Sequence, residues 1–165
     1  MINHIKAMLI ISASSAAQLG HMFSPEDPAM PFIRISVFGR NAGAAEIQRL
    51  QTETTRLMTS IMRKPAAGTA VLVEQVCGDW SIAGRSVVVG AQVDVTIGRG
   101  TNTAEEKARF ISEMMALLRA ALGDDLPEAS YIVLHELDLN SYGRGGITRA
   151  ERERRAETSL VGAGT

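Results

Sequence analysis

The feature that most constrains the fold is an internal repeat of one strand–helix–strand pattern. Each half of the chain contains, in order, an alternating strand, a glycine–arginine turn, an amphipathic helix, a second strand and a glycine-rich hairpin. The halves start about sixty residues apart. A β-α-β unit of this length joins two parallel strands by a right-handed crossover. The repeat therefore predicts an α/β (α+β) fold of tandem β-α-β units, with a four-stranded sheet and two helices on one face.

The strands and hairpins are indicated by period-two alternation and by glycine-rich breaks. We expect two units, residues 31–90 and 91–147. The predicted strands are residues 31–38, 71–76, 93–97 and 131–137, and the predicted hairpins are residues 78–84 and 140–146. Helices on one face leave the other face of the sheet bare, which favours oligomerisation through the sheets.

Two amphipathic segments predict the helices. The first spans about residues 44–63. The second spans about residues 104–122, where Thr103 is the N-cap and Glu106 stands at the capping-box spacing. The expected buried faces are Ile47, Leu50, Thr54, Leu57, Met58 and Ile61 in the first helix, and Ala108, Ile111, Met115 and Leu118 in the second.

The two ends of the chain lie outside the repeat. Residues 1–29 have three interpretations: translation of sequence upstream of a true start at Met30, a poorly ordered arm, or a cleaved signal with a thin charged region. Residues 148–165 are charged and have no apolar stripe, so we expect a frayed helix followed by a flexible tail.

Composition excludes several classes of function. A formal net charge of -1 gives no global field that would attract nucleic acid or an anionic membrane. The apolar runs fall short of the roughly 20 residues that span a bilayer, so a cytoplasmic location is expected. A single cysteine, Cys77, excludes an internal disulfide and a cysteine-based zinc site, and we expect it in the core or at a sheet edge. His135, within an apolar strand, is expected to be a hydrogen-bonded histidine that is buried or at an interface rather than a catalytic one.

The repeat resembles a known family. Pro31 at the head of a strand, the Gly39-Arg40 turn, the helix, the valine-rich second strand and "DWSIAGRS" are similar to the 4-oxalocrotonate tautomerase family of the tautomerase superfamily. A second copy with "NSYGRGG" is similar to the fused members, in which three chains form a trimer. The resemblance implies a homotrimeric keto–enol isomerase acting on a small 2-oxo acid carboxylate, without metal or cofactor.

The resemblance assigns the catalytic role to Pro31. An α-amino group has a pKa of roughly 7.7–8.0, and an apolar pocket favours its neutral form, so such an amine can act as a general base near neutral pH. A proline inside a chain is an amide and has no basic nitrogen. The mechanism therefore requires a chain that starts at Met30 and loses this methionine, or processing that exposes Pro31.

Other residues are assigned to substrate binding by their positions in the resemblance. Arginines can bind a carboxylate through two parallel hydrogen bonds, and the aromatic residues line the pocket. The candidates are Arg40, Arg99, Trp80, Tyr142, Arg85 and Arg144. The family's second-strand arginine is replaced by Leu72 and Tyr131, and the second unit, which starts near Ala91, has no proline. We expect one proline site per chain and a substrate other than 4-oxalocrotonate.

Two alternatives stay open at the level of sequence. Some superfamily members hydrate or dehalogenate haloacrylates and use a carboxylate to activate water, but neither hairpin turn carries one; Glu74 and Glu136 lie on strands. The second alternative is a catalytically inactive tautomerase-fold protein with a binding or structural role, which would follow if Pro31 is not N-terminal.

Overall fold

The fold is a four-stranded mixed sheet covered by helices on one face. A computed structural model describes residues 31–162, so the predictions for residues 1–29 lie outside the described part. The sheet consists, in spatial order, of β2 (Ala70–Val76), β1 (Phe32–Phe38), β5 (Gly90–Gly98) and β6 (Tyr131–Leu137). β1 pairs with β2 and β5 with β6 in parallel, whereas β1 and β5 are antiparallel. The predicted tandem β-α-β arrangement is confirmed.

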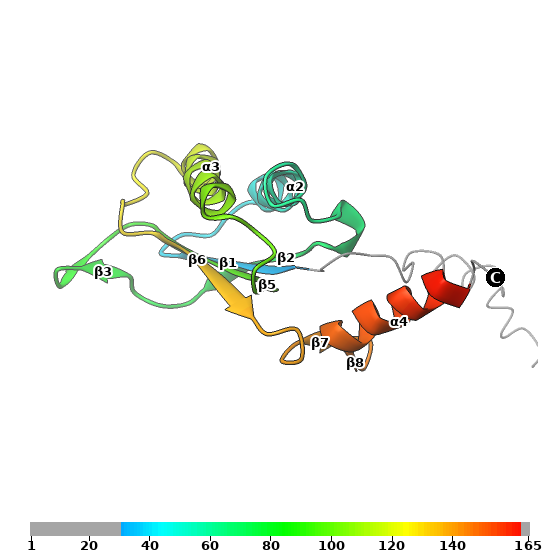
Figure 1. The fold of residues 1–165 in the computed structure, drawn as a ribbon. Helices are drawn as coiled ribbons and strands as arrows, with labels where there is room; N and C mark the ends of the chain where they lie inside the picture. The colour runs from blue at the N-terminus through cyan, green and yellow to red at the C-terminus, as the bar shows by residue number, and fades with distance from the viewer. Residues whose placement is uncertain (1–30, 163–165) are drawn as a thin grey trace, which may run out of the picture.

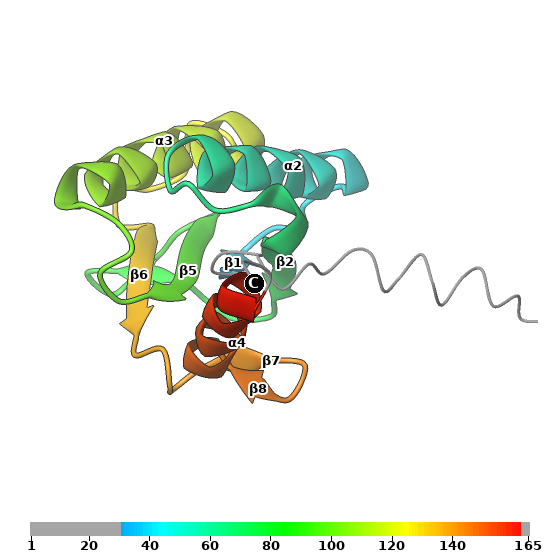
Figure 2. The ribbon, with the colours of Figure 1, turned by 45° about the vertical axis from the view of Figure 1, so that its right-hand side comes forward.

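Both long helices lie side by side on the same face of this sheet (Figures 1 and 2). They are α2 (Ala44–Ser60) and α3 (Ala104–Leu122). The expected face of α2 is confirmed, since Leu50, Thr54, Leu57 and Met58 are buried and Ile47 packs against the core. Thr103 and Glu106 form the expected capping box of α3. The core lies between these helices and the inward side chains of the strands.

The predicted buried face of α3 is wrong. Ala108 is exposed, Ile111 is 38% exposed and Met115 is only partly buried, so that Leu118 alone of the expected four is buried. The residues that α3 buries are Phe110, Met114, Leu117, Leu118, Ala121 and Leu122. Apolar residues occur on more than one side of this helix, so the helical period of apolar residues alone does not predict which side is buried. Burying the Phe110 ring removes more apolar surface from water than burying Ala108.

Short elements follow each unit. The first hairpin, β3 (Ser81–Ile82) with β4 (Arg85–Ser86), and the second, β7 (Gly143–Arg144) with β8 (Ile147–Thr148), extend from opposite ends of the sheet (Figure 1). The remaining elements are η1 (Ala66–Gly68) and α4 (Arg149–Gly162). The C-terminal segment, expected to be charged and without an apolar stripe, thus contains a helix of four turns.

The face of the sheet opposite α2 and α3 carries four charged or titratable side chains, one on each strand. Ser36 Oγ donates to Glu74 at 2.7 Å, and Arg34 lies 3.8 Å from the same carboxylate. On the other unit, His135 Nε2 lies 2.7 Å from Asp94 Oδ1, so His135 is hydrogen-bonded as expected. Its side chain is 46% exposed, so it is not buried within the single chain. Arg34 stands opposite Asp94 in the β1–β5 register.

This opposite face also exposes apolar side chains. Phe32 and Leu72 are each 40% exposed and Tyr131 is 58% exposed. Large apolar side chains at such exposure are typical of a surface that another molecule covers. Among residues 31–162, no helix combines the length and apolar character needed to cross a bilayer.

Candidate functional site

The predicted site residues divide between two ends of the sheet. Because β1 and β5 are antiparallel, the start of β1 lies beside the end of β5, and the end of β1 beside the start of β5. The proline end, as we call it, contains Pro31, Arg99, Tyr142 and Arg144. The tryptophan end contains Arg40, Trp80 and Arg85. Within one chain, Pro31 and Arg40 are therefore separated by the full length of β1.

Pro31 is buried at the proline end. Its carbonyl accepts a hydrogen bond from the Ala70 amide at 3.1 Å, which ties the start of β1 to β2. Phe32 pairs with Thr96, so the next position in the antiparallel register sets Pro31 opposite Ile97. The neighbouring Gly98 is buried as well.

Tyr142 packs directly over Gly98. A Cβ at Gly98 would lie 2.9 Å from the Tyr142 hydroxyl oxygen, so only glycine leaves room for the tyrosine here. The hydroxyl is buried and has no hydrogen-bond partner within residues 31–162. Burial raises the pKa of Tyr142, and the nearby Arg149 opposes this effect. The phenol is therefore neutral near pH 7 and able to donate a hydrogen bond to a ligand.

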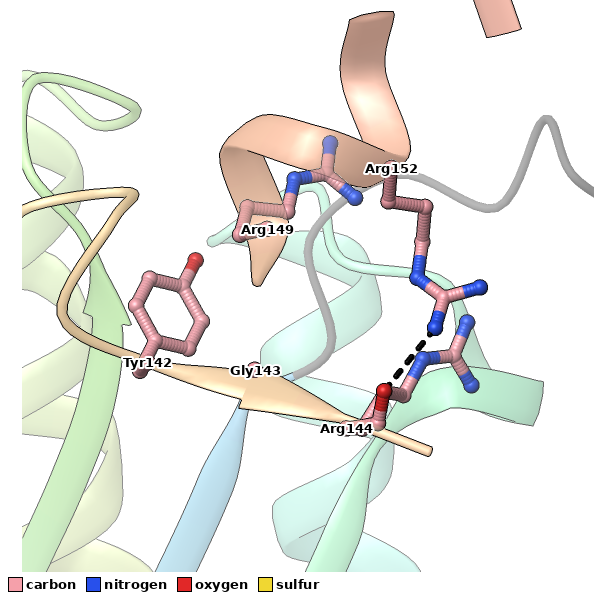
Figure 3. A pocket seen from close by; sticks show the side chains of 5 residues that line it. All are labelled: Tyr142, Gly143, Arg144, Arg149 and Arg152. Atoms are coloured by element: carbon pink, nitrogen blue, oxygen red, sulfur yellow. Dashed lines mark hydrogen bonds between the residues drawn. The ribbon is translucent and has the colours of Figure 1, made fainter. Parts of the chain in front are cut away.

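A basic pocket opens beside this tyrosine (Figure 3). Its lining is Tyr142, Gly143, Arg144, Arg149 and Arg152, and its cavity volume is about 40 Å³. We call it the Tyr142 pocket. Arg152 Nη2 donates to the Arg144 carbonyl at 3.1 Å, and Arg149 Nε donates to Glu153 Oε1 at 2.8 Å.

Sequence reasoning missed Arg149 and Arg152. Both lie near the start of α4, in the segment for which we expected a frayed helix followed by a flexible tail and no site residue. Arg149 is held against the second hairpin, because its amide donates to the Tyr142 carbonyl at 3.0 Å. The signal present in the sequence is a pair of arginines three residues apart immediately after a glycine-rich hairpin, a spacing that puts both on one helix face.

Arg99 lies at the same end, exposed to solvent, with carboxylates near it. The pKa of Glu136 is lowered chiefly by a hydrogen bond from Lys107, at 3.1 Å, and by a smaller effect of Arg99. The pKa of Asp138 is lowered by hydrogen bonds from the backbone and side chain of Asn140, with Arg99 again contributing. Both groups are carboxylates at neutral pH.

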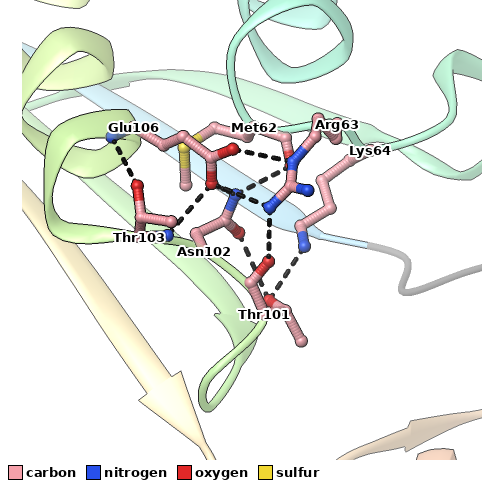
Figure 4. A network of polar contacts seen from close by, with 7 residues as sticks. All are labelled: Met62, Arg63, Lys64, Thr101, Asn102, Thr103 and Glu106. Atoms are coloured by element: carbon pink, nitrogen blue, oxygen red, sulfur yellow. Dashed lines mark hydrogen bonds and ion pairs between the residues drawn. The ribbon is translucent and has the colours of Figure 1, made fainter.

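A polar network connects α2 and the start of α3 beside the proline end (Figure 4). Arg63 Nε lies 2.7 Å from Glu106 Oε1, and Asn102 Nδ2 donates to Glu106 Oε2 at 2.9 Å. Lys64 Nζ donates to Thr101 Oγ1 at 2.8 Å, and burial lowers the pKa of Lys64. The Thr101 hydroxyl donates in turn to the Gly98 carbonyl at 2.8 Å. The network thus fixes the turn that ends β5.

At the tryptophan end, Trp80 packs over Gly90 and against Phe38. A Cβ at Gly90 would lie 2.7 Å from the indole ring, and the Phe38 and Trp80 ring centroids are 4.8 Å apart. Trp80 and Tyr142 therefore cover glycines at opposite ends of β5. Cys77 is exposed after the edge strand β2, in agreement with an edge position.

The two arginines of the tryptophan end, Arg40 and Arg85, differ in their contacts. Arg40 Nη2 pairs with Glu46 and donates to the Ala121 carbonyl at 3.3 Å, so its guanidinium connects α2 to the end of α3. Arg85 is exposed in β4. The structure does not bring Arg40, Trp80 or Arg85 to Pro31 of the same chain.

Comparisons with known proteins identify the fold. No protein-family model and no curated protein sequence matches this chain. Among solved structures, Pt0534 inactivated by 2-oxo-3-pentynoate is 19% identical, with a TM-score of 0.64, and the match covers 73% of this chain and 98% of that one. The Q0 fused 4-OT, a symmetric trimer, is 19% identical with a TM-score of 0.59, covering 72% and 96%. A macrophage migration inhibitory factor-like protein from Entamoeba histolytica is 17% identical with a TM-score of 0.59, covering 72% and 98%.

These likenesses and the strand order define the class: an α+β protein with the tautomerase-superfamily fold. The chain spans nearly the whole of each of these structures, and about a quarter of it extends beyond the match. The fold expected from the resemblance to fused 4-oxalocrotonate tautomerases is confirmed.

Proposed function

We propose that this protein is a keto–enol tautomerase for a small 2-oxo acid, with the nitrogen of Pro31 as general base. The observation that carries the proposal is the position of Pro31: buried, at the head of β1, in the tautomerase-superfamily fold. Arg99, Tyr142 and Arg144 belong to the same end of the sheet. The proposal requires a mature chain that begins at Pro31.

The chemistry follows from a free secondary amine in a buried position. The neutral nitrogen accepts the hydroxyl proton of the enol and returns a proton to carbon, so that one proton moves from oxygen to carbon. Arginine binds the substrate carboxylate. The neutral Tyr142 hydroxyl donates a hydrogen bond to a substrate oxygen. The proposed proton transfer uses no metal or cofactor.

We propose a homotrimer as the active assembly. Arg40, Trp80 and Arg85 lie too far along the sheet to serve Pro31 of their own chain, and a neighbouring copy would bring the tryptophan end to the proline end. The trimeric state of the Q0 fused 4-OT supports this arrangement by analogy.

The state of the carboxylates at the proline end supports a tautomerase over a hydratase. A hydratase needs a carboxylate that can take a proton from water. Glu136 accepts a hydrogen bond from Lys107. The pKa values of Glu136 and Asp138 are both lowered, which makes these carboxylates weaker bases.

Replacement of Pro31 tests the proposal. Pro31→Ala should reduce the rate of ketonisation of phenylenolpyruvate by at least about a hundredfold, the scale of general base catalysis. Pro127→Ala, in the loop after α3, is the matched control and should keep wild-type activity. Intact mass of protein expressed from the native gene should begin at Pro31. A mass beginning at Met1, or full activity of Pro31→Ala, would contradict the mechanism.

A further inference from the structure

We propose that copies of this chain join through the two outer strands of the sheet, with His135 on β6 of one copy donating a hydrogen bond to Glu74 on β2 of the next. The inference rests on the homotrimer proposed above, and it adds the contact that joins the copies and the dependence of that contact on protons. β2 and β6 are the outer strands of the sheet, on opposite sides of it in Figure 2. Unpaired edge strands are places where another chain readily joins a sheet.

The exposed side chains of the two edge strands are complementary to each other. β2 carries Leu72, which is 40% exposed, and Glu74, whose side chain is 36% exposed. β6 carries Tyr131, which is 58% exposed, and His135, whose side chain is 46% exposed. Each edge therefore combines an exposed apolar residue with a partly exposed titratable residue, which is an acid on β2 and a base on β6.

This complementarity favours one way of joining the copies. Two β2 edges would bring Glu74 against Glu74, and two β6 edges would bring His135 against His135. A contact of β2 with β6 pairs an acid with a base instead. Such a contact uses a different surface on each partner, and heterologous contacts of this kind close into a ring when the rotation between copies allows it. A homotrimer of cyclic symmetry is such a ring.

Atoms suited to the contact remain available on both side chains. His135 Nε2 lies 2.7 Å from Asp94 Oδ1, which leaves Nδ1 for a second acceptor. A protonated imidazole donates from both of its ring nitrogens. Glu74 contacts Ser36 and Arg34 through Oε1, which leaves Oε2 to accept a further hydrogen bond. A protonated His135 would thus bridge Asp94 of its own chain and Glu74 of the next.

The charge balance of this face links assembly to pH. Among residues 31–162, the charged or titratable side chains that the four strands place on it are Glu74, Arg34, Asp94, Tyr131 and His135. While the imidazole is neutral, two carboxylates share one guanidinium. Protonation of His135 supplies the second cation, so that acids and bases alternate from strand to strand and across the junction. Histidine gains its charge between about pH 8 and pH 5, so association should take up protons and strengthen as the pH falls through this range.

Sedimentation velocity of the full chain over a concentration series, at about pH 6 and about pH 8 and constant ionic strength, tests the proton dependence. The concentration at which half of the protein is assembled should be at least about tenfold lower at the lower pH. His135→Gln keeps a hydrogen-bonding side chain and should abolish this difference. The matched control is the His4→Gln/His21→Gln double variant, which removes the other two histidines of the sequence and should keep the wild-type pH dependence.

Replacement of the acidic partner gives a second, independent test. Glu74→Gln should weaken assembly at the lower pH about as much as His135→Gln does. The Glu74→Gln/His135→Gln double variant should lose no more than either single variant, because all three lack the same interaction. Glu128→Gln, in the loop after α3, is exposed and should assemble like wild type. Assembly of the wild type that is equal at both pH values, or a pH difference retained by His135→Gln, would overturn the inference.

Disulfide formation tests the position of the contact. A Glu74→Cys/His135→Cys variant in a Cys77→Ser background should form chains that are covalently linked into dimers and trimers on oxidation. Within one chain the two positions lie on the outer strands, three strand spacings of about 4.8 Å apart, which is beyond the reach of a disulfide. Each single-cysteine variant should stay unlinked, because like edges do not meet. Links in a single-cysteine variant, or none in the double variant, would contradict the contact.

Failure of this inference can be told apart from failure of the proposed function. Pro31→Ala should assemble with the wild-type pH dependence even though it loses ketonisation. Ketonisation by a wild type whose assembly does not depend on pH would support the function and overturn the inference. Interchain disulfides in the double-cysteine variant, together with no ketonisation by the wild type, would support the contact and contradict the proline mechanism.

Discussion

Arg63 illustrates how single residues hold the proline end together. Its backbone is left-handed, with a φ of 56°, which costs energy in any residue with a Cβ. The ion pair of its side chain with Glu106 offsets this energy. Glu106 also accepts hydrogen bonds from the Asn102 side chain and from the Thr103 amide, the latter at 3.0 Å. One carboxylate therefore caps α3 and anchors the end of α2.

The Glu106 carboxylate should make stability depend on acid. Hydrogen bonds from Asn102 first, then from the Thr103 backbone and Arg63, lower the pKa of Glu106 below its ordinary value of 4.5. A carboxyl group with a lowered folded-state pKa stabilises the protein above its unfolded pKa and loses that contribution as pH falls through the folded pKa. In urea unfolding, Glu106→Gln should have a lower free energy of unfolding than wild type at neutral pH. This difference in free energy should shrink below about pH 4.5.

The control for this prediction is Glu128→Gln, which changes an exposed carboxyl group in the loop after α3. Its free energy of unfolding should differ from wild type by about 0.5 kcal/mol or less. A Glu106→Gln difference that is constant across the acid range would show that the network does not depend on ionised Glu106.

At the scale of elements, the hydrophobic periodicity of α3 was insufficient to predict which face of the helix is buried. The helix has apolar residues on several sides, and its contacts with the side chains of α2 decide which of these sides is buried. Thr54 and Met114 meet in the interface, with the Thr54 hydroxyl 3.7 Å from the sulfur. Arg40 and Arg49 of the first unit reach carbonyls at the end of α3, Ala121 and Ala120, and help to fix its rotation.

Two neighbouring residues on α3 test this rotation. Phe110→Ala should destabilise the protein by about 3–5 kcal/mol, because it removes a fully buried ring and leaves a cavity. Ile111→Ala changes a side chain that is 38% exposed and should cost about 1 kcal/mol or less. Chemical denaturation gives both values. Equal losses would mean that α3 buries a different face.

At the scale of the whole molecule, the sheet face opposite the helices remains exposed in the single chain. Acidic and basic residues alternate across its four strands, in the order Glu74, Arg34, Asp94 and His135, and exposed apolar side chains lie on the same face. Parallel strand pairs are usually covered on both faces. This face is therefore the surface through which the proposed trimer would assemble.

A charge placed on this face should prevent assembly. Tyr131→Glu puts an unpaired carboxylate at a side chain that is 58% exposed in the single chain, and burying it between copies would be costly. Sedimentation velocity should show a trimer for wild type and a monomer with unchanged circular dichroism for Tyr131→Glu. Thr52→Glu, on the exposed side of α2, should remain trimeric. A monomeric wild type would contradict the proposed assembly.

Local pattern by itself determined the repeat, the four main strands, both long helices and the layer that they form. This was possible because alternation, capping residues and glycine breaks act over a few residues. The same patterns predicted the buried face of α2, whose outer side is charged.

Only the tertiary structure decided which distant residues share a site. The antiparallel pairing of β1 with β5 puts Pro31 near Tyr142 and far from Arg40, a fact about strand direction that no local pattern contains. The Tyr142 pocket forms within residues 142–152, where α4 packs against the second hairpin and brings Arg149 and Arg152 to Tyr142. Arg40 pairs with the nearby Glu46 and reaches the distant carbonyl of Ala121 at the end of α3. The sequence determined the elements because their signals are local, whereas the position of Pro31 beside Tyr142 depends on strand pairing between residues far apart in the chain.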